Sequence, residues 1–196
     1  MTLNQYLFLL INHIAEKNYW LDVAMITIAE YTPYFFLLIL IFYWFYKRGK
    51  FQDTVLYAGY SAVLGLFVNR IISLAYGHNR PFVDGLGKNL VPHIPDSSFP
   101  SDHTTFVLCI AITFFLFQKT RVLGFFFFFI GFVSGIARVF VGVHYPFDVF
   151  GSLAVALLSA VIIFLYRKML MPINRIMIAI NRKIFKNGKG NIKENL

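Results

Sequence analysis

The sequence has few of the charged residues that cover the surface of a soluble protein. Only 14% of its 196 residues are charged, whereas 58% are hydrophobic and 19% are aromatic, and the mean hydropathy is +0.66. A soluble domain of this length cannot bury so much apolar surface. Because about 20 apolar residues in a helix span a bilayer, the composition indicates an integral membrane protein.

Cysteine is nearly absent as well. The single cysteine, Cys109, lies inside an apolar run. An internal disulfide is therefore excluded, and a small packing residue is the natural interpretation. Residues 1–17 lack a basic start and a small-residue cleavage site, so we expect no cleaved signal peptide.

Long apolar blocks divide the chain. They lie at about 21–46, 54–76, 104–117, 122–141 and 147–166. The first block is overlong and contains Glu30 and Pro33, so we expect a kink or a break near residue 31. Residues 3–14 set leucines on one helical face but are too short to cross comfortably, which predicts an interfacial or partly inserted helix.

Basic residues orient these blocks. They cluster at 47–50, at Lys119 and Arg121, and from Arg167 onward, at positions that alternate with the spans. The positive-inside rule then places these clusters in the cytoplasm and the loops 77–102 and 142–147 outside. Because the basic residues do not form one aromatic-laced surface, we expect no nucleic-acid partner.

The chain therefore divides into two predicted parts. Residues 1–166 would form a membrane domain that begins with an interfacial segment at 1–17, and residues 167–196 would form a basic cytoplasmic tail. Within the tail, residues 171–186 alternate isoleucine and methionine with Arg and Lys at helical spacing. That pattern is typical of an amphipathic helix on an anionic membrane surface.

Unusual polar residues gather beside the two outer loops. They form three clusters: Arg80-Pro81, then Pro100-Ser101-Asp102-His103, then Arg138 with His144 and Asp148. Singly, each has an ordinary explanation as a snorkelling arginine, an interfacial histidine or a helix cap. Together, at one membrane face and with complementary chemistry, they predict one functional site.

The side chains of this set suit phosphate chemistry. Arg80 and Arg138 offer planar forks for phosphate oxygens, and Ser101 and a helix N-terminus add donors. Pro146 suits the first helical position, so Asp148 would be third and could accept a proton from His144. The other ring nitrogen of His144 would then be free as nucleophile or base. His103 could supply a proton to a leaving oxygen.

At these residues the sequence resembles the type 2 phosphatidic acid phosphatase superfamily of membrane lipid phosphatases. The shared pattern is R-P, then P-S-x-H, then S-R-x5-H-x3-D, over about residues 54–166. The resemblance implies that His144 forms a phosphohistidine, Asp148 orients it and His103 protonates the leaving group. It also implies that Arg80, Ser101 and Arg138 hold the phosphoryl oxygens, in a six-helix protein without metal or other cofactor.

The chain departs from this pattern at three positions. The usual lysine seven residues before the motif arginine is Ser73, and Arg70 or Lys88 could supply the missing charge. Ala137 replaces the serine of S-R, and Asp102 replaces the glycine of P-S-G-H. We expect the Asp102 carboxylate to be turned away as a helix cap or held by an arginine.

A subgroup shares the P-S-D-H form, the R-P-F and D-S-S-F-P-S-D-H stretches and the small size: the undecaprenyl-diphosphatases of the bacitracin-resistance type. Resemblance to this subgroup implies a polyprenyl diphosphate lipid as substrate and a role in recycling the carrier lipid for peptidoglycan synthesis in the bacterial cell wall. No pattern in the sequence indicates an oligomeric state.

The predicted fold is an all-α polytopic membrane bundle of about six helices, with its active site at the extracytoplasmic membrane edge. The sixth helix would come from residues 3–14 or from a split of 21–46. Two alternatives stay open: a broader phosphatase acting on phosphatidic acid or phosphatidylglycerol phosphate, and a non-enzymatic transporter of anions. Transporter sites tend to lie between repeats at the midplane, which this sequence does not suggest.

Overall fold

The computed structural model describes residues 1–46 and 50–193, and over these residues the secondary structure is entirely helical. Seven helices follow one another: α1 (Leu3–Asn12), α2 (Tyr19–Tyr46), α3 (Lys50–Ala75), α4 (Asp102–Leu116), α5 (Arg121–Phe140), α6 (Pro146–Leu165) and α7 (Arg167–Lys193). Most of the predicted basic cluster at 47–50 and the chain end at 194–196 lie outside the described residues, as do the side chains beyond Lys183.

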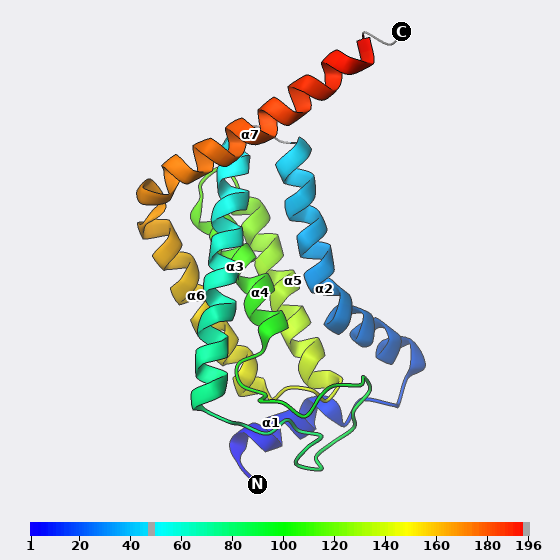
Figure 1. Cartoon of the computed structure of the whole chain (residues 1–196). Coiled ribbons are helices and arrows are strands. Elements are labelled where there is room, and N and C mark those ends of the chain that lie inside the picture. Colours follow the sequence, from blue (N-terminus) through cyan, green and yellow to red (C-terminus); the bar gives the residue numbers. More distant parts are fainter. Residues whose placement is uncertain (47–49, 194–196) are drawn as a thin grey trace.

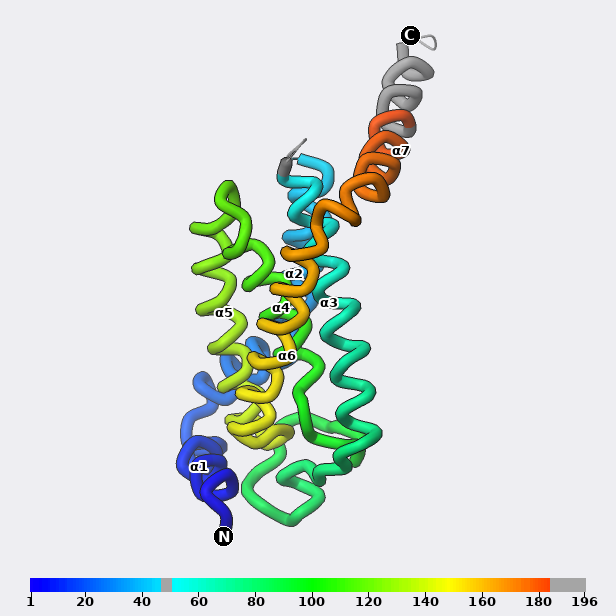
Figure 2. The backbone as a smooth tube through the Cα atoms, turned by 90° about the vertical axis from the view of Figure 1, so that its left-hand side faces the viewer, coloured from blue at the N-terminus to red at the C-terminus, as the bar shows by residue number. Residues whose placement is uncertain are grey.

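Helices α2 to α6 run side by side as a bundle, and the other two helices lie at its opposite ends (Figure 1). The view in Figure 2 shows α1 at one end, beside the long loop between α3 and α4, and α7 at the other end. Four stretches are long and apolar enough to cross a membrane: Tyr19–Tyr46, Phe51–Ala75, Arg121–Phe140 and Pro146–Leu165. The prediction of an all-α membrane bundle is therefore confirmed.

Helix α4 is the centre of the bundle although it is the shortest of the five upright helices. It packs against α3, α5 and α6, and almost every residue from Thr104 to Phe114 is buried. Cys109 is fully buried there, and a Cβ on Gly65 of α3 would lie 2.6 Å from its sulfur. The close approach of α3 to α4 therefore needs a glycine opposite a small side chain.

Helix α2 continues through Pro33 as one helix, so of the two predicted alternatives near residue 31, a kink or a break, the break does not occur. Figure 1 shows instead a bend in the first half of α2, as expected where a proline removes a backbone hydrogen bond. Since α2 is not split, the sixth helix of the predicted membrane domain is α1.

Helix α1 packs with the face that carries Phe8 and Asn12. Phe8 and Asn12 are buried, whereas Leu3 and Leu10 are about half exposed or more. The Asn12 amide donates to the backbone oxygens of Lys88 and Phe140, each at 2.8 Å, and its oxygen accepts from the Lys88 N–H at 2.7 Å. Helix α1 thus fastens the long loop to the end of α5, and Leu3 and Leu10 face outward. Its predicted interfacial placement stays a prediction.

A sharp turn joins α5 to α6. Gly142 has a φ of +91°, and a side chain there would overlap the backbone oxygen of Lys88. The Leu90 N–H donates to the Val141 oxygen at 2.9 Å, so the long loop runs directly beside this turn. Only glycine adopts such a conformation at so close an approach without strain, and this turn places His144 at the end of the bundle.

Candidate active site

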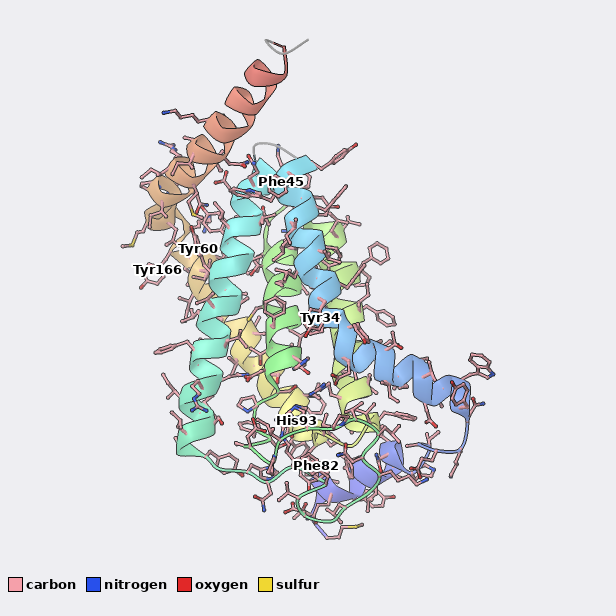
Figure 3. The ribbon with its side chains drawn as sticks, turned by 45° about the vertical axis from the view of Figure 1, so that its right-hand side comes forward. Tyr34, Phe45, Tyr60, Phe82, His93 and Tyr166 are labelled. Atoms are coloured by element: carbon pink, nitrogen blue, oxygen red, sulfur yellow. The ribbon has the colours of Figure 1, made fainter. Side chains whose placement is uncertain are left out.

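The three predicted polar clusters meet at the end of the bundle that carries α1 and the long loop. They surround a cavity of about 220 Å³. Its lining residues come from α3, the loop, the first turn of α4, the end of α5 and the α5–α6 turn: Asn69, Arg70, Ser73, Arg80, His93, Asp96, Ser97, Pro100, Asp102, His103, Arg138 and His144. Figure 3 shows His93 in the loop directly below the upright helices, at this end of the molecule.

His144 lies at the wall of the cavity and is 2% exposed. Its Nε2 is 3.2 Å from Nη1 of Arg80, and its Nδ1 is 3.4 Å from Oδ2 of Asp148. Because a guanidinium can only donate, Nε2 must carry the lone pair and Nδ1 the proton. This tautomer leaves a nucleophilic nitrogen on the side of the cavity and directs the N–H toward the carboxylate.

Burial lowers the pKa of His144 to about 4, opposed by the hydrogen bond and charge of Asp148 and reinforced by the positive charges of Arg138 and Arg80. The imidazole is therefore neutral at neutral pH. Neutral imidazole is the form that can attack phosphorus.

The start of α6 holds Asp148 in position. Pro146 is the first helical residue, as the sequence predicted, and Oδ2 of Asp148 reaches back to accept the Tyr145 N–H at 2.7 Å. The Ser98 hydroxyl donates to the same oxygen. The other oxygen, Oδ1, is buried without a hydrogen-bond partner among the described residues. The Tyr145 backbone and the loop residue Ser98 thus fix the carboxylate, which orients the His144 ring from the start of α6.

The two motif arginines are buried and each is held by one acid. Arg80, 5% exposed, donates from Nε to Asp96 at 2.8 Å and from Nη1 to the Val143 oxygen at 2.9 Å. Arg138, fully buried, donates from Nη1 to Glu30 of α2 at 2.5 Å. Nε and Nη2 of Arg138 have no partner among the described residues. Buried donors without partners are costly, and an anionic ligand in the cavity would satisfy them.

His103 and Asp102 open α4 at the rim of the cavity. His103 is partly buried and has no hydrogen-bond partner among the described residues. Asp102 accepts from the Asn69 amide at 2.9 Å, while the capping position belongs to Ser101. The expectation that Asp102 acts as a cap or pairs with an arginine was therefore wrong: an amide of α3 holds it, and it still lines the cavity.

Two other predicted groups, Ser101 and Lys88, do not line the cavity. Ser101 is fully buried; its oxygen accepts from the Thr104 hydroxyl at 3.1 Å and caps α4, and it is not among the lining residues. Lys88 lies elsewhere, since its Nζ donates to the Ala15 oxygen at 2.7 Å and pairs with Glu16 at 3.0 Å. These contacts give Lys88 a structural role at the end of α1 and remove it from the set of phosphate-binding candidates.

Arg70 and Ser73 both line the cavity from α3. Arg70 is exposed, and its guanidinium has no hydrogen-bond partner among the described residues. Of the two candidates for the missing lysine charge, Arg70 is therefore the one that the cavity can use.

Three partners were missed from the sequence: Glu30, Asp96 and Ser98. Glu30 was interpreted only as a break in an apolar block, although an acid inside a span usually has a partner. Ser98 and Asp96 belong to the D-S-S-F stretch that carried the resemblance without a chemical role. Among the side chains that the structure describes, no three of His, Cys, Asp or Glu gather as a metal site would require.

An adjoining apolar hollow of about 300 Å³ leads away from the rim between α2, α3 and α4. It is lined by Pro33, Tyr34, Leu37, Leu66 and Phe106, together with Asp102 and His103. Figure 3 shows Tyr34 on α2 close to the bend. A polar cavity thus opens onto an apolar groove at the side of the bundle.

Comparison with known proteins gives this arrangement a context. The chain is 38% identical over 170 residues to the undecaprenyl-diphosphatase BcrC of Bacillus subtilis, which covers 87% of each chain. It is 34% identical over 158 residues to a Bacillus licheniformis protein named bacitracin transport permease protein BcrC, covering 80% of this chain and 77% of the other. It is also 31% identical over 157 residues to the putative undecaprenyl-diphosphatase YbjG of Escherichia coli, covering 80% and 79%.

Two solved structures share the fold. The crystal structure of LpxE from Aquifex aeolicus superimposes with a TM-score of 0.72 at 25% identity, covering 85% of this chain and 97% of that one. A PAP2-type phosphatidylglycerolphosphate phosphatase from Bacillus subtilis superimposes with a TM-score of 0.61 at 20% identity, covering 85% of each chain. The sequence model of the PAP2 superfamily matches residues 54–172. The resemblance drawn from three short motifs is therefore confirmed, and the chain belongs to the PAP2 superfamily of membrane phosphatases.

Proposed function

We propose that the chain is an undecaprenyl-diphosphate phosphatase, which hydrolyses undecaprenyl diphosphate to undecaprenyl phosphate and inorganic phosphate. The identity of 38% to a protein of that name over most of both chains supports this substrate. The observation that carries the proposal is the buried His144, with Nδ1 toward Asp148 and Nε2 on the side of a cavity containing two arginines. The product would return as carrier lipid to peptidoglycan synthesis.

In the proposed first step, Nε2 of His144 attacks the terminal phosphorus and a P–N bond forms. The P–O bond to the lipid phosphate breaks, and His103 gives its proton to the leaving oxygen. Asp148 keeps the proton on Nδ1 and stabilises the positive charge that develops on the ring. The free Nε and Nη2 of Arg138 and the fork of Arg80 bind the equatorial oxygens.

In the second step, a water molecule takes the place of the lipid phosphate. His103, now neutral, accepts a proton from this water while its oxygen attacks phosphorus and the P–N bond breaks. Inorganic phosphate leaves and His144 returns to its neutral form. Ser101 contributes through the start of α4, whose free N–H groups and dipole favour an anion.

A diphosphate headgroup needs more positive charge than one phosphoryl group. The exposed Arg70 at the edge of the cavity supports binding of the second phosphate, and the groove at Tyr34 and Phe106 supports binding of the first isoprene units. We expect higher kcat/KM for undecaprenyl diphosphate than for phosphatidic acid when purified protein releases phosphate in one detergent.

The broader lipid phosphatase remains the second candidate because of Asp102. Its carboxylate lines the cavity and should repel a second phosphate. Equal kcat/KM values for the two lipids, or a preference for phosphatidic acid, would favour that function over the one proposed.

The proposed chemistry uses arginines and a helix end for neutralisation and requires no metal ion. Two acids at the cavity, Asp96 and Asp102, are already bound to Arg80 and Asn69. We therefore expect full activity in excess chelator; complete loss that magnesium restores would contradict this part of the proposal.

The cavity is proposed to face outside the cytoplasmic membrane, with α7 in the cytoplasm. The described basic residues Lys119, Arg121 and Lys168 lie at the end opposite to the cavity, which supports this orientation through the positive-inside rule. Cysteines introduced by Asn89→Cys and Lys119→Cys in a Cys109→Ser background should label from opposite faces of intact cells. Labelling of both from outside would overturn the orientation.

A further inference from the structure

A cavity at the other end of the bundle has no part in the proposed reaction. It measures about 840 Å³ and lies where α7 crosses the ends of α3 and α4, at the end of the bundle opposite to His144 (Figure 1). This volume is within the range of small-molecule sites. The cavity is therefore a second place where a ligand of substantial size would fit.

The rim of this cavity is basic. Lys168, Arg175 and Arg182 line it from α7, spaced seven residues apart, so they form one stripe along the helix. Lys168 and Arg182 have no hydrogen bond or ion pair among the described residues, and Arg175 donates only to the sulfur of Met171 at 3.4 Å. The single acid in the lining, Asp53, already accepts from Asn174 at 3.2 Å. The three cations thus have no carboxylate bound to them among the described residues.

The floor of the same cavity is apolar and ordered. The rings of Tyr57 and Phe117 stack in parallel with centroids 5.2 Å apart, and Ile178 of α7 is 8% exposed. The Tyr57 hydroxyl donates to the Arg167 oxygen at 2.9 Å, which fixes the start of α7 above the floor. Figure 3 shows Tyr60, whose hydroxyl donates to Asn174 at 3.0 Å, on α3 close to α7. A cationic rim beside an apolar floor matches a ligand with an anionic head and an apolar chain.

The other face of α7 indicates where this cavity opens. Met169, Ile173, Ile176 and Ile180 are each at least half exposed and lie on a face separate from the basic stripe. A helix with one basic face and one exposed apolar face is typical of the interface between headgroups and acyl chains. The cavity therefore opens at the headgroup level of the leaflet on that side of the membrane.

From these features we propose that the α7 cavity binds an anionic glycerophospholipid, whose phosphate lies between Lys168, Arg175 and Arg182 and whose acyl chain lies on Tyr57, Phe117 and Ile178. This site is independent of the phosphatase proposal, since it shares no residue with the catalytic cavity. It is a non-catalytic lipid site, because the described lining contains no histidine or other nucleophile of the kind that the catalytic cavity provides.

The test is native mass spectrometry of the full chain in detergent, titrated with phosphatidylglycerol or with phosphatidylcholine. We expect a one-to-one phosphatidylglycerol adduct with at least about tenfold higher affinity than phosphatidylcholine. The variant Lys168→Gln/Arg175→Gln/Arg182→Gln should lose at least about tenfold in this affinity. Its matched control, Lys119→Gln/Arg121→Gln/Lys183→Gln, removes the same charge outside the cavity and should bind as the wild type does.

A second variant tests the role of the cavity space separately from the role of the basic residues. Ala179 lines the cavity, so Ala179→Trp keeps every cation but fills the space, and it should also abolish the adduct. Unchanged binding by Ala179→Trp, equal loss in both charge variants, or equal affinity for phosphatidylcholine would overturn the proposal.

A dimer mass without lipid would place a second copy in the cavity and overturn the proposal as well. Phosphate release in detergent alone should be equal in all variants, so failure of this site and failure of the proposed phosphatase activity are distinguishable.

Discussion

The two ends of the helix bundle both collect positive charge, yet they do so in opposite ways. At the catalytic end, Arg80 and Arg138 are buried, and each is bound to one acid through a short hydrogen bond. At the α7 end, Lys168, Arg175 and Arg182 are exposed and have no carboxylate partner among the described residues. One end holds charge rigidly inside protein, and the other presents it to the surroundings.

The difference teaches what burial does to a cation. A buried guanidinium needs partners, because desolvation otherwise costs several kcal/mol; Glu30 and Asp96 therefore fix the orientation of the arginines and leave selected N–H groups for a ligand. An exposed cation keeps its water and its rotamer freedom. Ligand binding at the catalytic end therefore depends on the precise orientation of the guanidinium groups. Ligand binding at the α7 end depends on the net charge and the shape of the cavity. Four predictions sharpen or break this comparison.

The largest effect is expected at His144. His144→Ala should lower kcat at least about 10³-fold, because it removes the one imidazole that Asp148 orients for attack. Phosphate release from purified protein measures it, and acid-labile radiolabel on the wild-type chain, absent from the variant, reports the phosphohistidine. Near-normal turnover of the variant would refute the covalent mechanism.

The arginine forks should distinguish the two ends directly. Arg138→Lys keeps the charge but loses the planar fork that reaches both Glu30 and the ligand, so kcat/KM should fall about 10²-fold. Arg175→Lys, the matched change at the α7 end, should alter kcat/KM by less than about twofold. Comparable losses in the two variants would mean that the catalytic end also depends on charge alone.

A pH effect should follow from the burial of His144. Its pKa is lowered to about 4, from about 6.5 in an unfolded chain. Between these values the folded state binds fewer protons than the unfolded state, so the free energy of unfolding falls as the pH falls through this window and levels off below 4. The change is roughly 3–4 kcal/mol. Thermal unfolding in detergent should show this loss of stability in the wild type and a smaller loss in His144→Asn. Identical pH profiles of the two proteins would contradict the prediction.

A smaller effect is expected from Asn12. Asn12→Ala removes three hydrogen bonds between α1, the long loop and α5, and leaves buried backbone groups of Lys88 and Phe140 unpaired. The free energy of unfolding should fall by about 2 kcal/mol. Arg182→Ala at the α7 end should change it by less than about 0.5 kcal/mol. Thermal unfolding of both variants measures the difference, and equal stabilities would show that α1 does not fasten the catalytic end.

Much of this protein was determined by local sequence. Apolar runs about the length of a bilayer specify helices that cross it, because the backbone must satisfy its own hydrogen bonds there. Pro146 at the first position of α6 fixed where Asp148 would lie relative to His144, and the order of the three motifs identified the family. These features depend on neighbours in the chain, so spacing alone predicts them.

The tertiary structure decided the partners. Glu30 and Arg138 are separated by 108 positions and Ser98 and Asp148 by 50, and no helical period relates them. The sequence made Lys88 a candidate phosphate ligand, but in the folded chain Lys88 forms an ion pair with Glu16. Asp102 accepts a hydrogen bond from the Asn69 amide of α3 and does not pair with an arginine. Such contacts follow from how helices pack around α4, and packing depends on shape over the whole bundle, which the sequence does not display residue by residue.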